Sequence, residues 1–248
     1  MSAWLDSLSG EFCIGFLVSS AAFNVIFHSI RYQGALTTEK QLAWILTFTT
    51  CVVVTTGSLP YVATLIASGF DVSKIVYTDT FSQMLIGLFL AYLFWDLALG
   101  LVYYRSTISV LTGYIHHTLY IVIVLYLAAH GVSAIFVLMC YNELPTIVLA
   151  LGHMRKEWRS DILFALTFFL TRILMHVIMM VKFYRYSEFR FIWKLMLLVL
   201  PMHLYWFYGA VRQNLRKYRK TRLGGDSLLS ATVDIAYGPT QSLVGGDT

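Results

Sequence analysis

Charged residues are scarce in this chain: Asp, Glu, Lys and Arg make up 12% of its 248 residues. A soluble globular domain carries about twice that fraction. Apolar runs of roughly 20 residues recur along the sequence, which is the length that crosses a bilayer as a helix. The composition therefore excludes a sizeable soluble domain and predicts an all-α, multi-pass integral membrane protein.

Cysteine and the common catalytic motifs are also scarce. The three cysteines, Cys13, Cys51 and Cys140, lie in apolar runs without paired spacing, so they predict neither a disulfide framework nor a metal site. The sequence has no His-Glu-x-x-His zinc motif, no Gly-x-Ser-x-Gly elbow and no phosphate-binding glycine loop. The first 30 residues contain no Lys or Arg, so no signal peptide is predicted. We predict no metal and no bound cofactor.

The apolar runs predict about seven transmembrane helices between a short lead, residues 1–10, and a tail, residues 216–248. The membrane domain, residues 11–215, is expected to contain the spans Glu11–Ile30, Gln41–Ile66, Thr80–Tyr103, Leu111–Ala129, Ser133–Leu151, Ile162–Val181 and Phe191–Val211. The tail is basic at first and then rich in Gly and Ser from Leu223, which is typical of disorder.

The distribution of positive charge predicts the orientation of the chain. Seven spans would leave twelve Lys and Arg residues on the side of the C-terminus and five on the other, with Arg172 inside the membrane. Cytosolic loops carry the excess of Lys and Arg, so a cytosolic C-terminus is expected. The net charge of +5 is explained by this asymmetry and does not point to nucleic acid.

Several ionisable side chains fall inside the predicted spans. Arg172 lies near the middle of its span, where a charge costs about 2.5–3.5 kcal/mol on insertion scales. It should therefore face the bundle and pair with a buried acid, and Asp96 and Glu143 are the candidates. His176 lies one turn after Arg172. Two interpretations remain open: a structural ion network that fixes helix packing, or the lining of a functional cavity.

Two adjacent histidines, His116 and His117, open the fourth span. They lie about 100° apart around a helix, so both cannot point into one cavity. We expect one to act while the other holds it by a hydrogen bond. Tyr120 lies one turn beyond His116 on the same stripe.

Three segments carry a resemblance to a known family. They are LAYLFWDLALGLVYYRSTISVLTGYIHHTLY, FVLMCYNELPTIVLALG and DILFALTFFLTRILMH. Together with their surroundings, roughly residues 40–215, they resemble the TLC-domain family of endoplasmic-reticulum membrane proteins, which includes the ceramide synthases. The most specific feature is the double histidine that follows an intramembrane Asp. The flanking segments are closer to the smaller members of the family.

The resemblance implies a TLC-type helical bundle around a lipid-sized cavity. In ceramide synthases the double histidine is needed to join the acyl chain of an acyl-CoA to the amine of a sphingoid base, which points to His116 and His117 here. The enzymes place two aspartates in the next helix, and those positions hold Glu143 and Thr146 in this chain.

Two functions follow as hypotheses. The first is an N-acyltransferase of sphingolipid metabolism with His116, His117 and Glu143 as catalytic residues, where Glu143 orients an imidazole and Tyr120 donates to the oxyanion. Asp96, Arg172 and His176 would then line the cavity or form ion pairs. The second is a non-enzymatic protein of membrane lipid homeostasis or trafficking that uses the same cavity. Both expect membrane lipids as partners and leave the oligomeric state open.

Overall fold

The computed structural model describes residues 8–75, 77–186 and 190–237, and within them every regular element is a helix. The α-helices of ten or more residues are α2 (Gly10–Tyr32), α4 (Ile45–Ala67), α5 (Thr80–Tyr103), α6 (His116–Ala129), α8 (Leu144–Met154), α10 (His176–Arg185) and α11 (Arg190–Tyr237). The shorter α-helices are α3 (Glu39–Leu42), α7 (Ser133–Met139) and α9 (Asp161–Phe168). This confirms an all-α fold.

Two π-helices and several 3₁₀ turns interrupt or join these helices. The π-helices are η3 (Val110–Ile115), immediately before α6, and η6 (Phe169–Met175), between α9 and α10. The 3₁₀ segment η4 (Cys140–Glu143) separates α7 from α8. The remaining 3₁₀ turns are η1 (Val72–Lys74), η2 (Arg105–Thr107) and η5 (Lys156–Trp158). The sequence predicts continuous spans at η4 and η6, so these breaks are features that the hydropathy pattern does not reveal.

Among the described residues, six helical segments are long and apolar enough to cross a membrane. They are Gly10–Tyr32, Glu39–Ala67, Thr80–Tyr103, Ser133–Met154, Asp161–Arg185 and Ile192–Arg219. The fourth of the seven predicted spans appears instead as a shorter apolar helix, Gly113–Ala129. Its α-helical part, α6, has 14 residues, which rise about 21 Å against a hydrocarbon core of about 30 Å.

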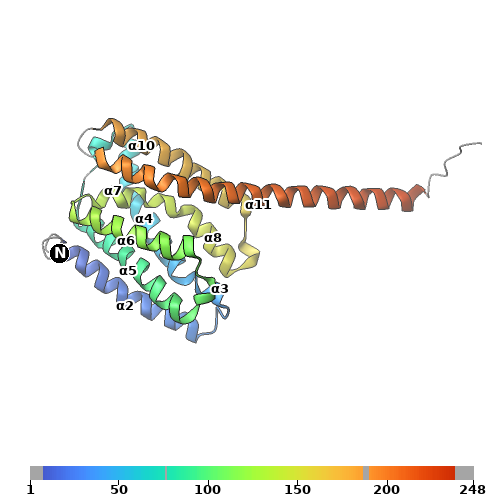
Figure 1. The fold of residues 1–248 in the computed structure, drawn as a ribbon, viewed down its shortest axis with the longest axis horizontal. Coiled ribbons are helices and arrows are strands. Elements are labelled where there is room, and N and C mark those ends of the chain that lie inside the picture. Colours follow the sequence, from blue (N-terminus) through green and yellow to red (C-terminus); the bar gives the residue numbers. More distant parts are fainter. Residues whose placement is uncertain (1–7, 76, 187–189, 238–248) are drawn as a thin grey trace, which may run out of the picture.

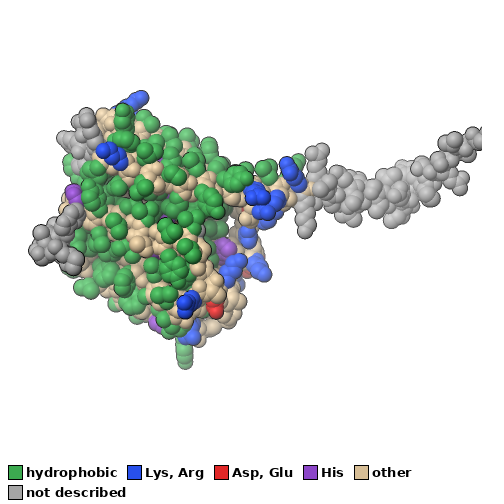
Figure 2. Space-filling view, in the orientation of Figure 1, with side chains coloured by type: hydrophobic (Ala, Val, Ile, Leu, Met, Phe, Trp, Pro, Cys, Tyr) green, Lys and Arg blue, Asp and Glu red, His purple; other side chains and the backbone are tan. Residues whose placement is uncertain are grey.

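The surface of the bundle matches a bilayer environment. Large apolar side chains are exposed on several helices, for example Leu17 at 65% and Ile162 at 76%. Figure 2 shows apolar side chains over most of the visible face, while Lys and Arg gather where α11 leaves the bundle. A soluble monomer rarely exposes contiguous apolar surface on this scale. The chain is therefore an integral membrane protein.

The helices are arranged as a bundle from which α11 projects. Figure 1 shows α2 starting at one end of the bundle and α11 leaving at the opposite end. The tail predicted to be disordered from Leu223 is helical as far as Tyr237, and residues 238–248 lie outside the described residues, as do residues 1–7 of the predicted lead. Extending an existing helix costs much less than nucleating one, which explains why α11 continues past its apolar part.

The contact between α2 and α5 depends on two glycines. A Cβ on Gly15 would lie 2.3 Å from the carbonyl oxygen of Met84, and a Cβ on Gly87 would lie 2.3 Å from that of Phe12. In each helix, a glycine lies directly against the backbone of the other helix. Small residues allow this close approach in membranes, where van der Waals packing drives helix association.

Hydrogen bonds between polar side chains connect α4, α5 and α7 at one end of the bundle. Asp79 caps α5 by accepting from the Ser82 backbone N–H at 2.7 Å, and the Tyr61 hydroxyl of α4 donates to the same carboxylate at 2.8 Å. The Ser133 hydroxyl at the start of α7 lies 2.8 Å from that of Ser82 and 2.7 Å from that of Thr78. These bonds tie α4, α5 and α7 together at fixed depth and so help to position the interior described next.

Candidate functional site

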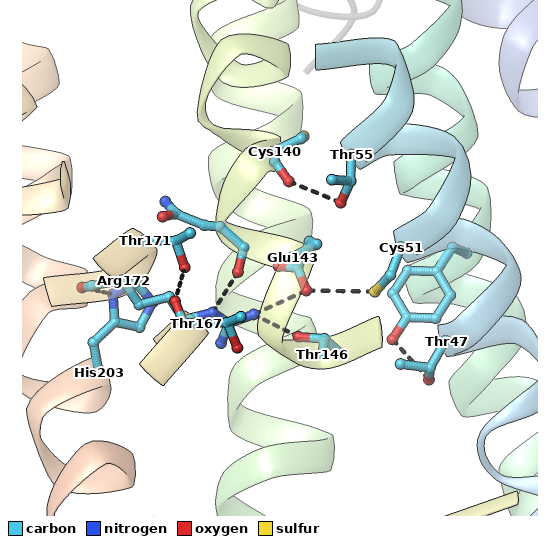
Figure 3. Close-up of polar contacts among 12 residues, drawn as sticks. Thr47, Cys51, Thr55, Cys140, Glu143, Thr146, Thr167, Thr171, Arg172 and His203 are labelled. Atoms are coloured by element: carbon cyan, nitrogen blue, oxygen red, sulfur yellow. Dashed lines mark hydrogen bonds and ion pairs between the residues drawn. The ribbon is translucent and has the colours of Figure 1, made fainter. Parts of the chain in front are cut away.

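Arg172 is the centre of a buried polar network. Arg172 is a residue of η6 and is only 7% exposed. Its Nε donates to the backbone oxygen of Asn142 at 2.6 Å, and its Nη2 donates to Glu143 Oε2 at 2.9 Å and to Thr146 Oγ1 at 2.7 Å. Figure 3 shows Arg172 reaching toward Glu143 and Thr146. The prediction that Arg172 pairs with a buried acid is confirmed, and the acid is Glu143.

The break at η4 makes this network possible. Pro145 lies in the first turn of α8 and has no backbone N–H, so it cannot donate the α-helical hydrogen bond to the carbonyl of Tyr141. The chain takes a 3₁₀ turn over Cys140–Glu143 instead, and the carbonyl of Asn142 accepts from Arg172. One short irregular segment therefore supplies both a backbone oxygen and a carboxylate to the guanidinium.

The carboxylate of Glu143 is held from a second side by α4. Cys51 Sγ donates to Glu143 Oε2 at 3.4 Å, and Thr55 Oγ1 donates to the backbone oxygen of Cys140 at 3.3 Å. In Figure 3 Glu143 lies between Arg172 and Cys51. No hydrogen bond joins Glu143 to His116 in the described part of the chain. Glu143 therefore does not orient the His116 ring in this structure, in contrast to the prediction.

Asp96 pairs with the second histidine of the doublet. His117 Nε2 lies 3.1 Å from Asp96 Oδ2, a distance typical of an ion pair although the contact lacks hydrogen-bond geometry. The other ring nitrogen, Nδ1, must carry a proton, because it lies 3.0 Å from the carbonyl oxygen of Gly113, which can only accept. The Tyr104 hydroxyl donates to Asp96 Oδ1 at 3.0 Å. His117 is therefore fixed by α5 and by its own helix.

His116 faces a different set of neighbours. Its ring lies 4.5 Å from the ring of Tyr120 and 5.4 Å from that of Trp206, measured between centroids. Its Nδ1 is buried and has no hydrogen-bond partner among the described residues. The expected hydrogen bond from one histidine to the other is not among the contacts of the described residues: the two rings meet edge to face at 5.6 Å, and His117 is held by Asp96 and Gly113 instead. The π-helix η3 ends immediately before the two histidines, and π-helical turns are frequent at functional sites.

An apolar cavity of about 100 Å³ lies between α5, α6, α7, η4, α10 and α11. Three of the predicted site residues line it: Tyr120, Glu143 and His176. His116, His117, Asp96 and Arg172 do not. An engineered cavity of about 150 Å³ takes up benzene, so this space is much smaller than the lipid-sized cavity that the family resemblance implies.

The cavity wall carries two buried polar atoms without partners among the described residues. His176 is 3% exposed, and its Nε2 donates to the carbonyl oxygen of Met196 at 3.0 Å, which leaves Nδ1 as an unbonded acceptor. Asn142 Oδ1 is the second such atom. Buried polar atoms normally have a partner, so both atoms are unusual features of residues that line the cavity.

Three residues of this region were missed or given little weight in the sequence analysis. His203 is 2% exposed, and its Nδ1 lies 3.2 Å from the carbonyl oxygen of Arg172. Trp206 lies under Arg172, whose Cζ is 5.9 Å from the ring centroid. Asn142 precedes Glu143 directly. The proximity of Asn142 to an intramembrane acid was a usable signal, whereas Trp206 resembles any tryptophan of an interfacial belt.

The described residues include no group of three or more His, Cys, Asp or Glu side chains that could hold a metal ion. Comparison with known proteins adds no relative: no family model, no curated protein and no solved structure matches this chain. The site itself consists of an apolar cavity, two lining residues that each have an unpartnered polar atom, and the buried imidazole of His116 nearby.

Proposed function

We propose that this protein binds a membrane lipid in the cavity between α5, α6, α7, α10 and α11, and acts in membrane lipid homeostasis or trafficking. The observation that supports this is the pairing of an apolar space with unpartnered polar atoms on His176 and Asn142. Ligand sites combine mostly apolar walls with a few placed polar groups. An acyl chain fills the apolar part while its head donates hydrogen bonds to the wall.

The resemblance to the TLC-domain family supports the same proposal. We accordingly place the protein among the smaller members of that family, in the endoplasmic reticulum with a cytosolic C-terminus. Sphingolipids and their precursors are the lipid class that the resemblance favours.

The test is lipid retention by a cavity-filling variant and a matched control. Val199 lines the cavity and is 6% exposed, whereas its neighbour Leu198 on α11 is 57% exposed. The wild-type protein should retain a specific lipid through detergent purification, identified by mass spectrometry. Val199→Phe should lose it and Leu198→Phe should keep it. Equal lipid content in all three proteins would refute the proposal.

A second candidate is N-acyl transfer from an acyl-CoA to a sphingoid base. It is favoured by the unpaired imidazole of His116, which lies against Tyr120 at the cavity wall while His117 is held by Asp96. A neutral imidazole can accept the proton of the attacking amine. Purified protein with both substrates should form ceramide. A wild-type rate no higher than that of His116→Ala would eliminate this candidate.

A further inference from the structure

Three arginines lie on one face of α11 where this helix leaves the bundle. Arg212, Arg216 and Arg219 are spaced four and three residues apart, so they fall within about 60° of one another around the helix axis. All three are exposed, and Figure 2 shows Lys and Arg side chains gathered at this exit. These residues, the arginine row, therefore present three guanidinium groups to the surroundings of the helix.

No carboxylate compensates the charge of the arginine row in the described part of the chain. The sequence has no Asp or Glu between Arg190 and Gly225, so α11 supplies no acid within reach of the row. The acid that contacts this part of α11 from another helix is Asp161, which pairs with Arg159 and Lys217. Lys217 lies about 130° from the middle of the row. Asp161 therefore contacts a different side of α11 and leaves the row uncompensated.

The side chains that precede the arginine row on the same face are those of a helix crossing a bilayer. Leu198, Tyr205 and Tyr208 lie on this face in that order, and each is more than half exposed. Tyrosine is enriched at the level of the lipid headgroups. With a rise of 1.5 Å per residue, Arg212 lies about 6 Å beyond Tyr208. The headgroup layer is about 5–7 Å thick, so Arg212 lies within or at the edge of it.

The two outer arginines also reach toward the headgroup layer. Arg216 and Arg219 lie about 12 and 17 Å beyond Tyr208 along the helix. The Cα–Cβ bonds of a helix tilt toward its N-terminus, and the N-terminal part of α11 is the part inside the bundle. The long arginine side chains therefore lean back toward the membrane. Trp158, which is 60% exposed in η5, indicates the same interface independently, because Asp161 holds its loop against α11.

The guanidinium group is suited to one component of that layer, the lipid phosphate. It donates two parallel hydrogen bonds to phosphate oxygens and stays charged at physiological pH. We propose that the arginine row binds the headgroups of anionic phospholipids in the leaflet from which α11 leaves the membrane. A zwitterionic lipid has the same phosphate but also a cation of its own, so it is bound more weakly. The arginine row is separate from the proposed lipid cavity, which none of its residues lines.

The experiment measures lipid binding to the full-length protein in a neutral detergent by native mass spectrometry. The probes are phosphatidylserine and phosphatidylcholine with identical acyl chains, so that binding in the cavity contributes equally to both. An arginine near an anionic lipid surface strengthens binding about fivefold, and salt reduces this effect. The wild-type protein should therefore bind phosphatidylserine at least about tenfold more tightly than phosphatidylcholine at low salt. Equal affinities for the two lipids would overturn the inference.

Two triple variants locate the binding surface. Arg212→Gln/Arg216→Gln/Arg219→Gln removes three charges at exposed positions and should reduce the preference for phosphatidylserine to about twofold or less. The matched control is Lys74→Gln/Arg185→Gln/Lys194→Gln, which makes the same change of charge at three exposed positions at the opposite end of the bundle. The control should keep the preference of the wild type. An equal loss in both variants would show that net charge alone attracts the lipid, and a preference that persists in the first variant would place binding elsewhere; either result would overturn the inference.

Discussion

The guanidinium of Arg172 and the carboxylate of Glu143 form a buried ion pair, with Nη2 and Oε2 2.9 Å apart. It connects the π-helix η6 with the 3₁₀ turn η4, both of which interrupt long apolar spans. Both partners have further bonds, Arg172 to Asn142 and Thr146 and Glu143 to Cys51. The pair therefore joins three membrane segments at one depth.

Removing one member of this pair should be more harmful than removing both. Arg172→Leu leaves Glu143 buried without its cation, which typically costs about 3–5 kcal/mol. The double variant Arg172→Leu/Glu143→Leu should recover much of that loss, because no uncompensated charge remains. Unfolding in a denaturing detergent measures both. Arg155→Leu is the control, since the Arg155–Glu157 pair is more than half exposed. A double variant as unstable as Arg172→Leu would contradict the prediction.

We expect His117 to contribute mainly to protein stability and His116 mainly to lipid binding. His117→Ala removes the partner of Asp96 and the bond to Gly113, so it should lower stability by about 1–3 kcal/mol. His116→Ala breaks no hydrogen bond of the structure and loses only the packing of the ring on Tyr120 and Trp206, so it should cost less stability than His117→Ala, but it should weaken lipid binding. Thermal unfolding and lipid retention are measured on both variants. Similar losses of stability would show that the two rings do not have separate roles.

Asp96 and His117 should be energetically coupled. A double-mutant cycle with Asp96→Asn and His117→Ala is expected to give a coupling of about 0.5–3 kcal/mol, the range for residues in contact within one network. Tyr104→Phe removes the hydroxyl that donates to the same carboxylate, and should couple to Asp96→Asn as well. The matched control is Tyr205→Phe, whose side chain is 62% exposed on α11. Additive single effects at Asp96 and His117 would disprove the coupling.

Adding a single methyl group at the crossing of α2 and α5 should be destabilising. Gly15→Ala and Gly87→Ala each place a Cβ against a backbone oxygen that has no flexible side chain to move aside. Overpacking of this kind costs about 1–3 kcal/mol. Gly209→Ala in α11 is the control, because a Cβ there meets nothing within 4 Å. It should be neutral or slightly stabilising, since Ala favours the helix more than Gly does.

Much of the fold follows from hydropathy alone, and α5 begins and ends at the residues predicted from it, Thr80 and Tyr103. The breaks at η4 and η6 do not, because a π-helix or a 3₁₀ turn leaves the apolar composition unchanged. The charge on Arg172 sufficed to predict a buried acidic partner. Choosing Glu143 over Asp96 required the packing of the helices, since both acids are equally isolated in the sequence.

The candidate site was predictable where a polar residue interrupts an apolar run. His116, His117 and His176 were found in this way. Trp206 was not, because its contacts with Arg172 and His116 depend on how α11 packs, whereas its ring is common at membrane interfaces. The size of the cavity was overestimated for a similar reason: sequence spacing shows which residues share a face, but not how much volume the facing side chains fill.

The glycine contact between α2 and α5 has a consequence for biogenesis. α2 is synthesised before α4 and α5, yet it packs chiefly on α5 and only slightly on α4. A nascent chain therefore holds α2 in the bilayer without its main partner until the ribosome has passed Tyr103. During that interval the face of α2 around Gly15 and the Phe12 carbonyl lacks the α5 backbone that it packs against in the folded protein.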